Sequence, residues 1–425
     1  MPRFHLKATH GTLLKNTLML QILQFSTYLL ALVAVPYETR VLGPETYGVL
    51  GAATAIMVYF QLVIDFGFLL SATEEVASNR DDIQALRKIL TSVTACKVLL
   101  AVLSAGVLAI LCRVIAPWRE KTGLYFLFFL STVCTSLMPD YLYRGMERMS
   151  AITIRTVAIR GFFTVAIFIF LKKPEDLYVV PVLNIIGNGC AMLAAYFDLA
   201  KRFGIRFTRI SRKDVTGALK RSSVFFYSRI ATTAYTSLNT VILDLVTASG
   251  IATGFYTAAD KLITTGKNLL SPISDSLYPY MVRNRDFKLV KKVLLWTPPL
   301  IALFCTACFI WAEPLCKLLL GAEYGPAGQV LRAMLPVGVI TLPSYILGFP
   351  TLSAMGLKQY ANYSVIFGSV LHICNLLLLY FSGHMNMVTL ATLVSVAEAA
   401  ILLFRICVIW KHRDRLRPEK EEPHE

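Results

Sequence analysis

Long apolar segments recur along the whole chain, and short breaks rich in charged residues, glycine and proline separate them. A helix of about 20 apolar residues crosses the hydrocarbon core of a bilayer, which is roughly 30 Å thick. Because lipid offers the backbone no hydrogen-bonding partner, each segment should be helical. The pattern predicts about twelve spans, at residues 16–36, 48–70, 89–115, 122–142, 152–171, 177–199, 222–246, 251–281, 290–311, 327–348, 360–381 and 387–410.

The composition agrees with a membrane protein. Hydrophobic residues make up 56% of the chain and charged residues 16%, against about 25% charged in an average soluble domain. The nine cysteines lie mostly in apolar segments, and the pair Cys305 and Cys308 has no nearby histidine or carboxylate, so we expect inert thiols and no metal site. The predicted fold class is an all-α integral membrane protein.

Basic residues collect on one side of the predicted spans. The central segment, residues 201–221, carries eight of the 42 lysines and arginines. Short cytoplasmic loops are enriched in these residues, and an even number of spans leaves both termini on one side. We therefore expect a multi-pass protein of the cytoplasmic membrane with both termini in the cytoplasm. The net charge of +16 then matches the anionic lipid surface and requires no nucleic acid.

Two short segments occur again about half a chain length later. "YGVLGAA" from Tyr47 resembles "TGFYTAA" from Thr253, and "RGMER" around Gly145 resembles "MGLKQ" around Gly356. Chance similarity of glycine-flanked loops is the alternative explanation. A true repeat predicts two six-helix halves related by a parallel pseudo-twofold axis, with a cleft between them near mid-bilayer. The predicted parts are an N-terminal half (1–200), a basic cytoplasmic linker (201–221), a C-terminal half (222–410) and a charged tail (411–425).

Several basic residues fall inside the predicted spans, where each costs roughly 2.5–3.5 kcal/mol if it faces lipid. Arg332, Lys267 and Arg405 lie near span ends, so we expect their side chains to snorkel to the membrane surface. The deeper residues are expected to line a wet cavity, although a purely structural network of ion pairs is the alternative. These cavity candidates are Arg160, Arg229 and Lys261, with Lys97 in reserve.

Two spans also carry stripes of hydrogen-bonding side chains at helical spacing, which places each stripe on one helix face. Hydrogen bonding between helices would explain such stripes equally well. The two stripes are not in register under the proposed repeat. They consist of Thr17, Gln21, Gln24 and Tyr28 in the first span, and of Arg229, Thr233, Thr236 and Thr240 in the seventh.

Acidic residues are fewer within the spans. Asp260 and Lys261 are neighbours in sequence and cannot face each other on a helix, so each needs its own partner or water. His372 lies near Asn375 in the eleventh span, and we expect it to pack rather than titrate. The acidic residues that could pair with the cations, or couple transport to H⁺ or Na⁺, are Asp65, Asp244, Asp260 and Glu398.

The sequence contains no pattern for ATP hydrolysis or other catalysis. No loop is long enough for a nucleotide-binding domain, and no glycine-rich phosphate loop ending in Gly-Lys-Ser/Thr occurs. We therefore expect neither an enzyme nor a cofactor, and transport is the leading role. An integral membrane glycosyltransferase or polymerase would need a catalytic base and a large outer loop, and neither is visible.

The segment "LGPETYGVLGAATAIMVYFQLVIDFGFLLSATEEVASNRDD" resembles the O-antigen type polysaccharide flippases, whose superfamily includes the multidrug and toxin extrusion transporters. "DYLYRGMERM" and the run from Tyr256 to Lys261 extend this resemblance. It implies that an undecaprenyl-diphosphate-linked oligosaccharide is flipped to the outer leaflet by alternating access, for cell-surface polysaccharide synthesis. Glycosyltransferases and a polysaccharide polymerase are the implied partners.

The leading hypothesis is therefore a lipid-linked oligosaccharide flippase. Arg160, Arg229, Lys261 and Lys97 would meet the anionic head group, and the polar stripe residues Gln21, Gln24, Tyr28 and Thr233 would bind sugar hydroxyls. The alternative is a cation-coupled exporter of small amphiphilic compounds. Such an exporter is expected to use an acidic, aromatic pocket, and the excess of intramembrane cations argues against it.

Overall fold

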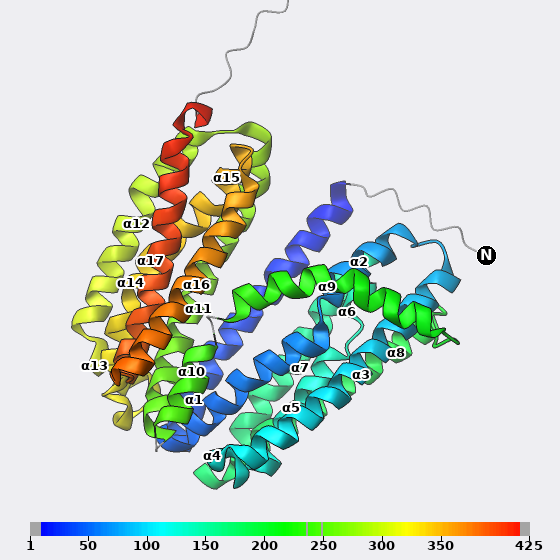
Figure 1. Ribbon diagram of the computed structural model, residues 1–425, viewed down its shortest axis with the longest axis horizontal. Helices are drawn as coiled ribbons and strands as arrows, with labels where there is room; N and C mark the ends of the chain where they lie inside the picture. Colours follow the sequence, from blue (N-terminus) through cyan, green and yellow to red (C-terminus); the bar gives the residue numbers. More distant parts are fainter. Residues whose placement is uncertain (1–9, 235–236, 248–249, 417–425) are drawn as a thin grey trace, which may run out of the picture. The chain divides into compact units, whose positions relative to one another are not determined.

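The computed structural model describes residues 10–234, 237–247 and 250–416, and these residues are almost entirely helical (Figure 1). They form two compact units, residues 1–233 and 234–425. The sequence predicted that the C-terminal half begins at residue 222. In the structure, the basic linker and the first part of the seventh span belong to the N-terminal unit.

Nine helical segments of the described chain are long and apolar enough to cross a membrane. The first of them, Gln21–Ser78, covers residues 21–36 of the first predicted span and all of the second. The predicted spans at 222–246 and 251–281 fall on helices that are not among the nine. The all-helical membrane fold predicted from the sequence is confirmed.

The N-terminal unit is a bundle in which α1 contacts α3, α5 and α7, while α8 packs on α5 and α7. Its helices are α1 (His10–Asp65), α2 (Phe68–Ser78), α3 (Ile83–Val114), α4 (Ala116–Arg119), α5 (Thr122–Ser136), α6 (Asp140–Gly145), α7 (Met149–Phe170), η1 (Pro174–Tyr178), α8 (Val179–Arg202) and α9 (Arg212–Ala234).

The break predicted between the first two spans is a sharp turn within α1. Gly43 lies there at φ 68° and ψ 171°, a conformation that glycine adopts without a steric penalty, and Pro44 follows it. Figure 1 shows the two arms of α1 meeting at this turn. The "LGPETYG" segment therefore reverses the chain, as its composition predicts.

A second break, which the sequence did not predict, interrupts the second span between α1 and α2. Phe66 has a φ of 39° and Gly67 a φ of 78°. A positive φ is an outlier for a bulky residue such as phenylalanine, and strained backbone of this kind costs about 1–3 kcal/mol. Surrounding contacts must therefore hold Phe66 in place.

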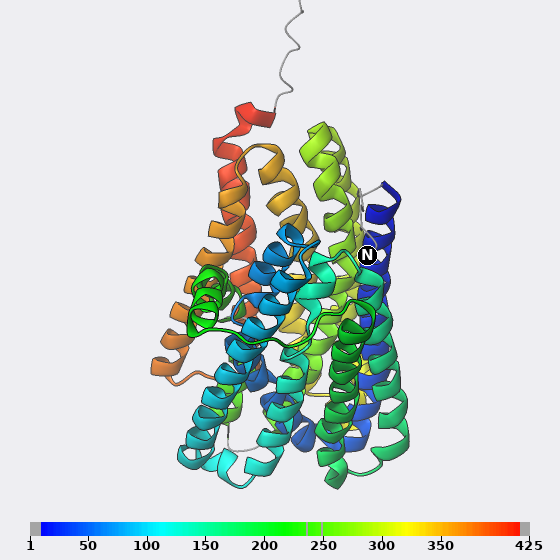
Figure 2. The same cartoon turned by 90° about the vertical axis from the view of Figure 1, so that its right-hand side faces the viewer.

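Helix α9 lies across the N-terminal unit. Figures 1 and 2 show it crossing the other helices of this unit at a steep angle. Its first turn contains Asp214, which accepts hydrogen bonds from the amide and hydroxyl of Ser211, both at 2.8 Å. These bonds hold the pKa of Asp214 below its ordinary value, so a charged carboxylate stabilises the positive end of the helix dipole.

The C-terminal unit is organised around α14, which contacts α11, α12, α13 and α17. The elements of this unit are α10 (Leu238–Val246), α11 (Gly250–Asn284), α12 (Phe287–Ile310), α13 (Ala312–Leu320), η2 (Ala322–Tyr324), α14 (Ala327–Ile346), η3 (Leu347–Thr351), α15 (Leu352–Ala354), α16 (Lys358–Ser382), α17 (Met387–Lys411) and η4 (Arg413–Leu416).

A buried arginine supports the irregular end of α14, where η3 forms a π-helical turn. Arg405 is only 6% exposed. Its guanidinium donates to the carbonyl and hydroxyl of Ser344 and, at 2.9 Å, to the Ser364 hydroxyl. The expectation that Arg405 snorkels is wrong, because polar groups on α14 and α16 satisfy it inside the unit.

Candidate functional site

A polar face of the N-terminal unit is formed by the first arm of α1 together with α7. The Thr153 hydroxyl on α7 donates to the Met19 carbonyl on α1 at 3.0 Å and fixes how the two helices align. About two turns further along, Arg160 on α7 lies within electrostatic range of Tyr28 on α1. The structure thus brings together two of the predicted site residues.

Arg160 is exposed, and among the described residues no carboxylate lies within ion-pair distance of it. Gln24 lies one turn before Tyr28, and its Oε1 is buried without a hydrogen-bond donor from the described part of the chain. Gln21 on the same helix is half-buried. We name Gln21, Gln24, Tyr28 and Arg160 the α1–α7 polar face. It combines a charge available to a ligand with unused hydrogen-bonding capacity.

Lys97, the reserve candidate, occupies a different setting. Its side chain is 6% exposed and pairs with Asp65 at 3.2 Å. The ammonium group also donates to the carbonyl of Ser136 at the end of α5 and lies 5.8 Å from the centre of the Tyr141 ring. The buried Lys97 and the half-buried coupling candidate Asp65 therefore form one ion pair beside the break in the second span.

The predicted polar stripe of the seventh span is divided in the structure. Arg229 is half-buried on α9 and Thr240 is buried on α10. The side chains of Thr17 and Thr233 lie outside the described residues, as does Thr236. The coupling candidate Asp244 is half-buried on α10.

Helix α11 carries the charged candidates of the C-terminal unit. Lys261 is exposed and Asp260 is half-buried. Asp260 lies within electrostatic range of Lys261 and Lys267, and Lys267 forms an ion pair with Glu398 on α17. The expectation that Lys267 snorkels is wrong, since its ammonium group is bound to a buried carboxylate. A network of structural ion pairs, the alternative for these charges, exists here in part.

A buried hydrogen-bond chain that the sequence did not reveal joins four helices of the same unit, α10, α11, α16 and α17. His372 Nε2 on α16 lies 2.9 Å from Asn239 Oδ1 on α10. The Asn239 amide nitrogen donates to the Tyr256 hydroxyl on α11 at 3.0 Å and to the Leu390 carbonyl at 3.2 Å. His372 packs in the core as expected. An asparagine inside an apolar segment was the signal that could have drawn attention to this chain.

The N-terminal and C-terminal units thus offer different chemistry. The α1–α7 polar face presents a cation and hydrogen-bonding groups, which suits an anionic head group with hydroxyls. In the C-terminal unit, Lys267 and Glu398 are engaged with each other. No cluster of metal-ligating side chains occurs among the described residues.

The sequence comparisons agree with each other. The model of the family described as "Polysaccharide biosynthesis protein" matches residues 13–285, well over half of the chain. A protein of Shigella dysenteriae named "Putative O-antigen transporter" is 25% identical over 399 residues, which cover 92% of this chain and 98% of that protein. A protein of Escherichia coli K12 with the same name is 25% identical, covering 82% of this chain and 85% of its own.

Two solved structures share the fold. The lipid II flippase MurJ in an inward closed conformation matches with a TM-score of 0.69 at 14% identity, covering 93% of this chain and 87% of MurJ. An inward-facing multidrug resistance MATE transporter of the MOP superfamily matches with a TM-score of 0.67 at 15% identity, covering 94% and 98%. This chain therefore belongs to the polysaccharide biosynthesis protein family, and it has the helical membrane fold of the MurJ and MATE transporters.

Proposed function

We propose that this protein is a flippase that moves an undecaprenyl-diphosphate-linked oligosaccharide from the cytoplasmic to the outer leaflet of the cytoplasmic membrane. The observation that carries the proposal is the α1–α7 polar face, where Arg160 is exposed and has no carboxylate partner among the described residues. An unneutralised arginine in a membrane span is costly in lipid. A diphosphate head group would provide the missing negative charge.

The names of the relatives support a lipid-linked saccharide as substrate. The curated relatives are named O-antigen transporters, and MurJ is named a lipid II flippase. Sugars and a diphosphate cannot cross hydrocarbon unaided, because their hydrogen bonds to water would be lost. Side chains such as Gln24 and Tyr28 would replace part of that water, and the polyprenyl tail would stay in lipid.

Four residues remain proposals for coupling to H⁺ or Na⁺. Asp65 and Glu398 already bind lysines, so coupling through either requires its lysine to move. Asp260 lies within electrostatic range of Lys261 and Lys267, and Asp244 is half-buried on α10; both stay candidates for coupling. Fold similarity to a MATE transporter at 15% identity does not by itself favour export of small amphiphilic compounds.

Depletion of the protein in cells without another flippase tests the proposal. Lipid-linked oligosaccharide should accumulate in the cytoplasmic leaflet, because synthesis would continue while export stops. The distribution between leaflets can be measured with a lectin or glycosidase that does not cross the membrane. Normal delivery to the outer leaflet in depleted cells would reject the assignment.

A further inference from the structure

Helix α9 packs directly against the break in the second span. Gly67 approaches α9 so closely that an added Cβ would lie 2.7 Å from the Phe225 Cβ and 3.0 Å from the Phe226 nitrogen. The Phe66 ring stacks on the Phe226 ring, with centroids 4.3 Å apart and planes at 20°. The two residues with positive φ are thus the residues that α9 covers.

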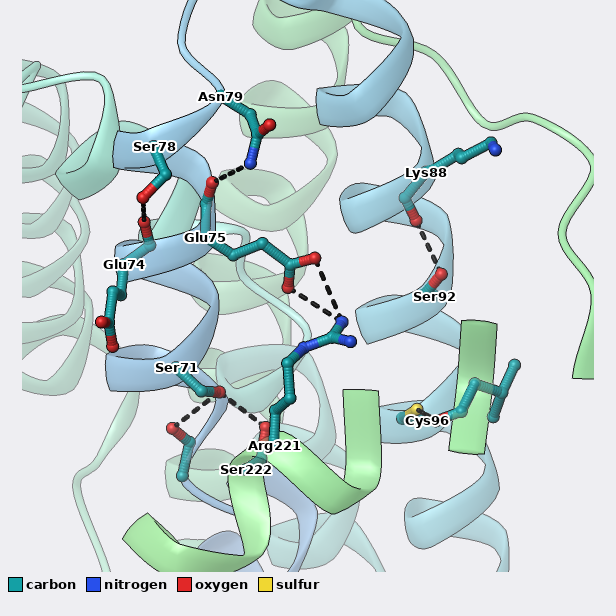
Figure 3. A network of polar contacts seen from close by, with 12 residues as sticks. Ser71, Glu74, Glu75, Ser78, Asn79, Lys88, Ser92, Cys96, Arg221 and Ser222 are labelled. Carbon is teal, nitrogen blue, oxygen red and sulfur yellow. Dashed lines mark hydrogen bonds and ion pairs between the residues drawn. The ribbon is translucent and has the colours of Figure 1, made fainter. Parts of the chain in front are cut away.

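Polar contacts continue along α2 on the same side (Figure 3). The Ser71 and Ser222 hydroxyl oxygens are 2.6 Å apart. One turn further, Arg221 NH2 donates to both carboxylate oxygens of Glu75, at 3.1 and 3.0 Å. Glu74 points away from Arg221 in this view. The contact of α9 with the break and with α2 therefore consists of a stacked ring pair, one hydroxyl pair and one ion pair, while Val215, Ala218 and Leu219 near the start of α9 pack on the core of the unit.

The ion pair between Arg221 and Glu75 can be broken and remade at low cost. The Arg221 side chain is 54% exposed and the Glu75 side chain 31% exposed, and exposed ion pairs are individually weak. The strained Phe66 backbone is held by the contact, so separation of α9 would release strain. Strained segments of this type are found where two conformations compete.

The position of α9 in the chain links this contact to movement of the two halves. Helix α9 is the segment through which the N-terminal unit continues into the C-terminal unit. Alternating access requires the two halves of a transporter to move, and the covalent connection must follow that movement. Docking of α9 in the break and the bend of the second span are therefore mechanically linked.

We propose that α9 is a reversible latch of the transport cycle. This inference rests on the proposed transport function. In one state of the cycle α9 docks on Phe66, Gly67, Ser71 and Glu75 and keeps the second span bent. In another state α9 leaves this surface, and the Asp65–Phe68 backbone relaxes toward a continuous helix. Both states must be visited for each molecule that is transported.

A disulfide between positions 71 and 222 tests the latch. In a background without native cysteines, Ser71→Cys and Ser222→Cys should form a disulfide on oxidation, because the two side chains already face each other. Flipping of a fluorescent undecaprenyl-diphosphate-linked oligosaccharide in proteoliposomes should fall at least tenfold and recover on reduction. The matched control is Ser131→Cys with Asn188→Cys, a contact at 3.4 Å within the same unit that does not involve α9; its oxidation should leave flipping unchanged.

A second readout does not depend on transport. Ser222 is 1% exposed, so Ser222→Cys should react with a water-soluble maleimide only when α9 undocks. Adding Glu75→Gln should raise the labelling rate several-fold, whereas Glu147→Gln, which breaks the comparable Arg80 pair at 2.8 Å, should not. The latch is wrong if the oxidised 71–222 variant flips the lipid at the full rate, or if Glu75→Gln leaves the labelling rate of Ser222→Cys unchanged. Absence of flipping by the reduced and unmodified proteins would instead reject the proposed function, and labelling would still decide the latch.

Discussion

At the scale of single residues, the account depends on which intramembrane cations are engaged by the protein itself. Lys97, Lys267 and Arg405 all have partners in the structure. Arg160 differs because it is exposed, with only Tyr28 as an electrostatic neighbour in the described contacts. Residue type alone could not separate these cases, since all four are basic residues in apolar segments.

Arg160→Ala should slow flipping in proteoliposomes by roughly ten- to a hundredfold, because hydrogen bonds to a charged group contribute about 1.5–3 kcal/mol each. The protein should still insert and unfold at its usual temperature. Arg332→Ala is the control, since Arg332 donates to the Phe309 carbonyl at 3.1 Å and should be dispensable for flipping. Equal flipping by Arg160→Ala and the unmodified protein would remove Arg160 from the site.

The ion pair between the buried Lys97 and the half-buried Asp65 leads to a prediction about stability. Lys97→Met leaves the Asp65 carboxylate without its partner, and breaking a buried pair in this way costs roughly 3–5 kcal/mol. The double variant Lys97→Met with Asp65→Asn removes both charges and should recover much of that loss. Thermal unfolding in detergent measures both. A double variant no more stable than Lys97→Met would show that the pair does not act as a unit.

At the scale of elements, the two breaks near the N-terminus were not equally predictable. The turn at Gly43 follows from local composition, because glycine and proline stand between two apolar runs. The break at Phe66 and Gly67 interrupts a segment that reads as one apolar helix. Its cause is tertiary, namely the close packing of Phe225 and Phe226 from α9, and this packing has no signal in the local sequence.

Gly67→Ala tests that explanation. Alanine at a φ of 78° costs about 1–2 kcal/mol, and its Cβ would clash with Phe225, so the unfolding temperature should fall. Gly106 in α3 has nothing within 4 Å of an added Cβ, and Gly106→Ala should stabilise the helix by about 0.5–1 kcal/mol. If both variants shifted the unfolding temperature equally, the close approach at Gly67 would not be important.

At the scale of the whole molecule, the sequence predicted the all-helical membrane fold and the family. Hydropathy and the distribution of basic residues in loops depend on the membrane, which imposes the same constraints on every span. These patterns can therefore be recognised without knowing how the helices pack. Pairings such as Lys267 with Glu398 and Asn239 with His372 join helices that are 131 and 133 residues apart. They depend on how helices pack within a unit, so residue patterns could nominate the charges but not their partners.

The charge of the proposed substrate predicts a dependence on membrane potential. Moving about two negative charges outward across 100 mV, inside negative, releases roughly 4–5 kcal/mol. An inside-negative potential imposed on proteoliposomes by a potassium gradient with valinomycin should therefore speed outward flipping. The reversed potential should slow it. If the flipping rate did not change with the potential, the head group would cross with its charge neutralised, for example by co-transported cations.

The most direct test of the account is flipping by the purified protein. A fluorescent undecaprenyl-diphosphate-linked oligosaccharide is placed in proteoliposomes, and a reagent that cannot cross the membrane quenches the fraction in the outer leaflet over time. We predict exchange between leaflets much faster than in protein-free vesicles, and its reduction by Arg160→Ala but not by Arg332→Ala. Exchange no faster than in protein-free vesicles, with the protein folded and inserted, would contradict the proposed function.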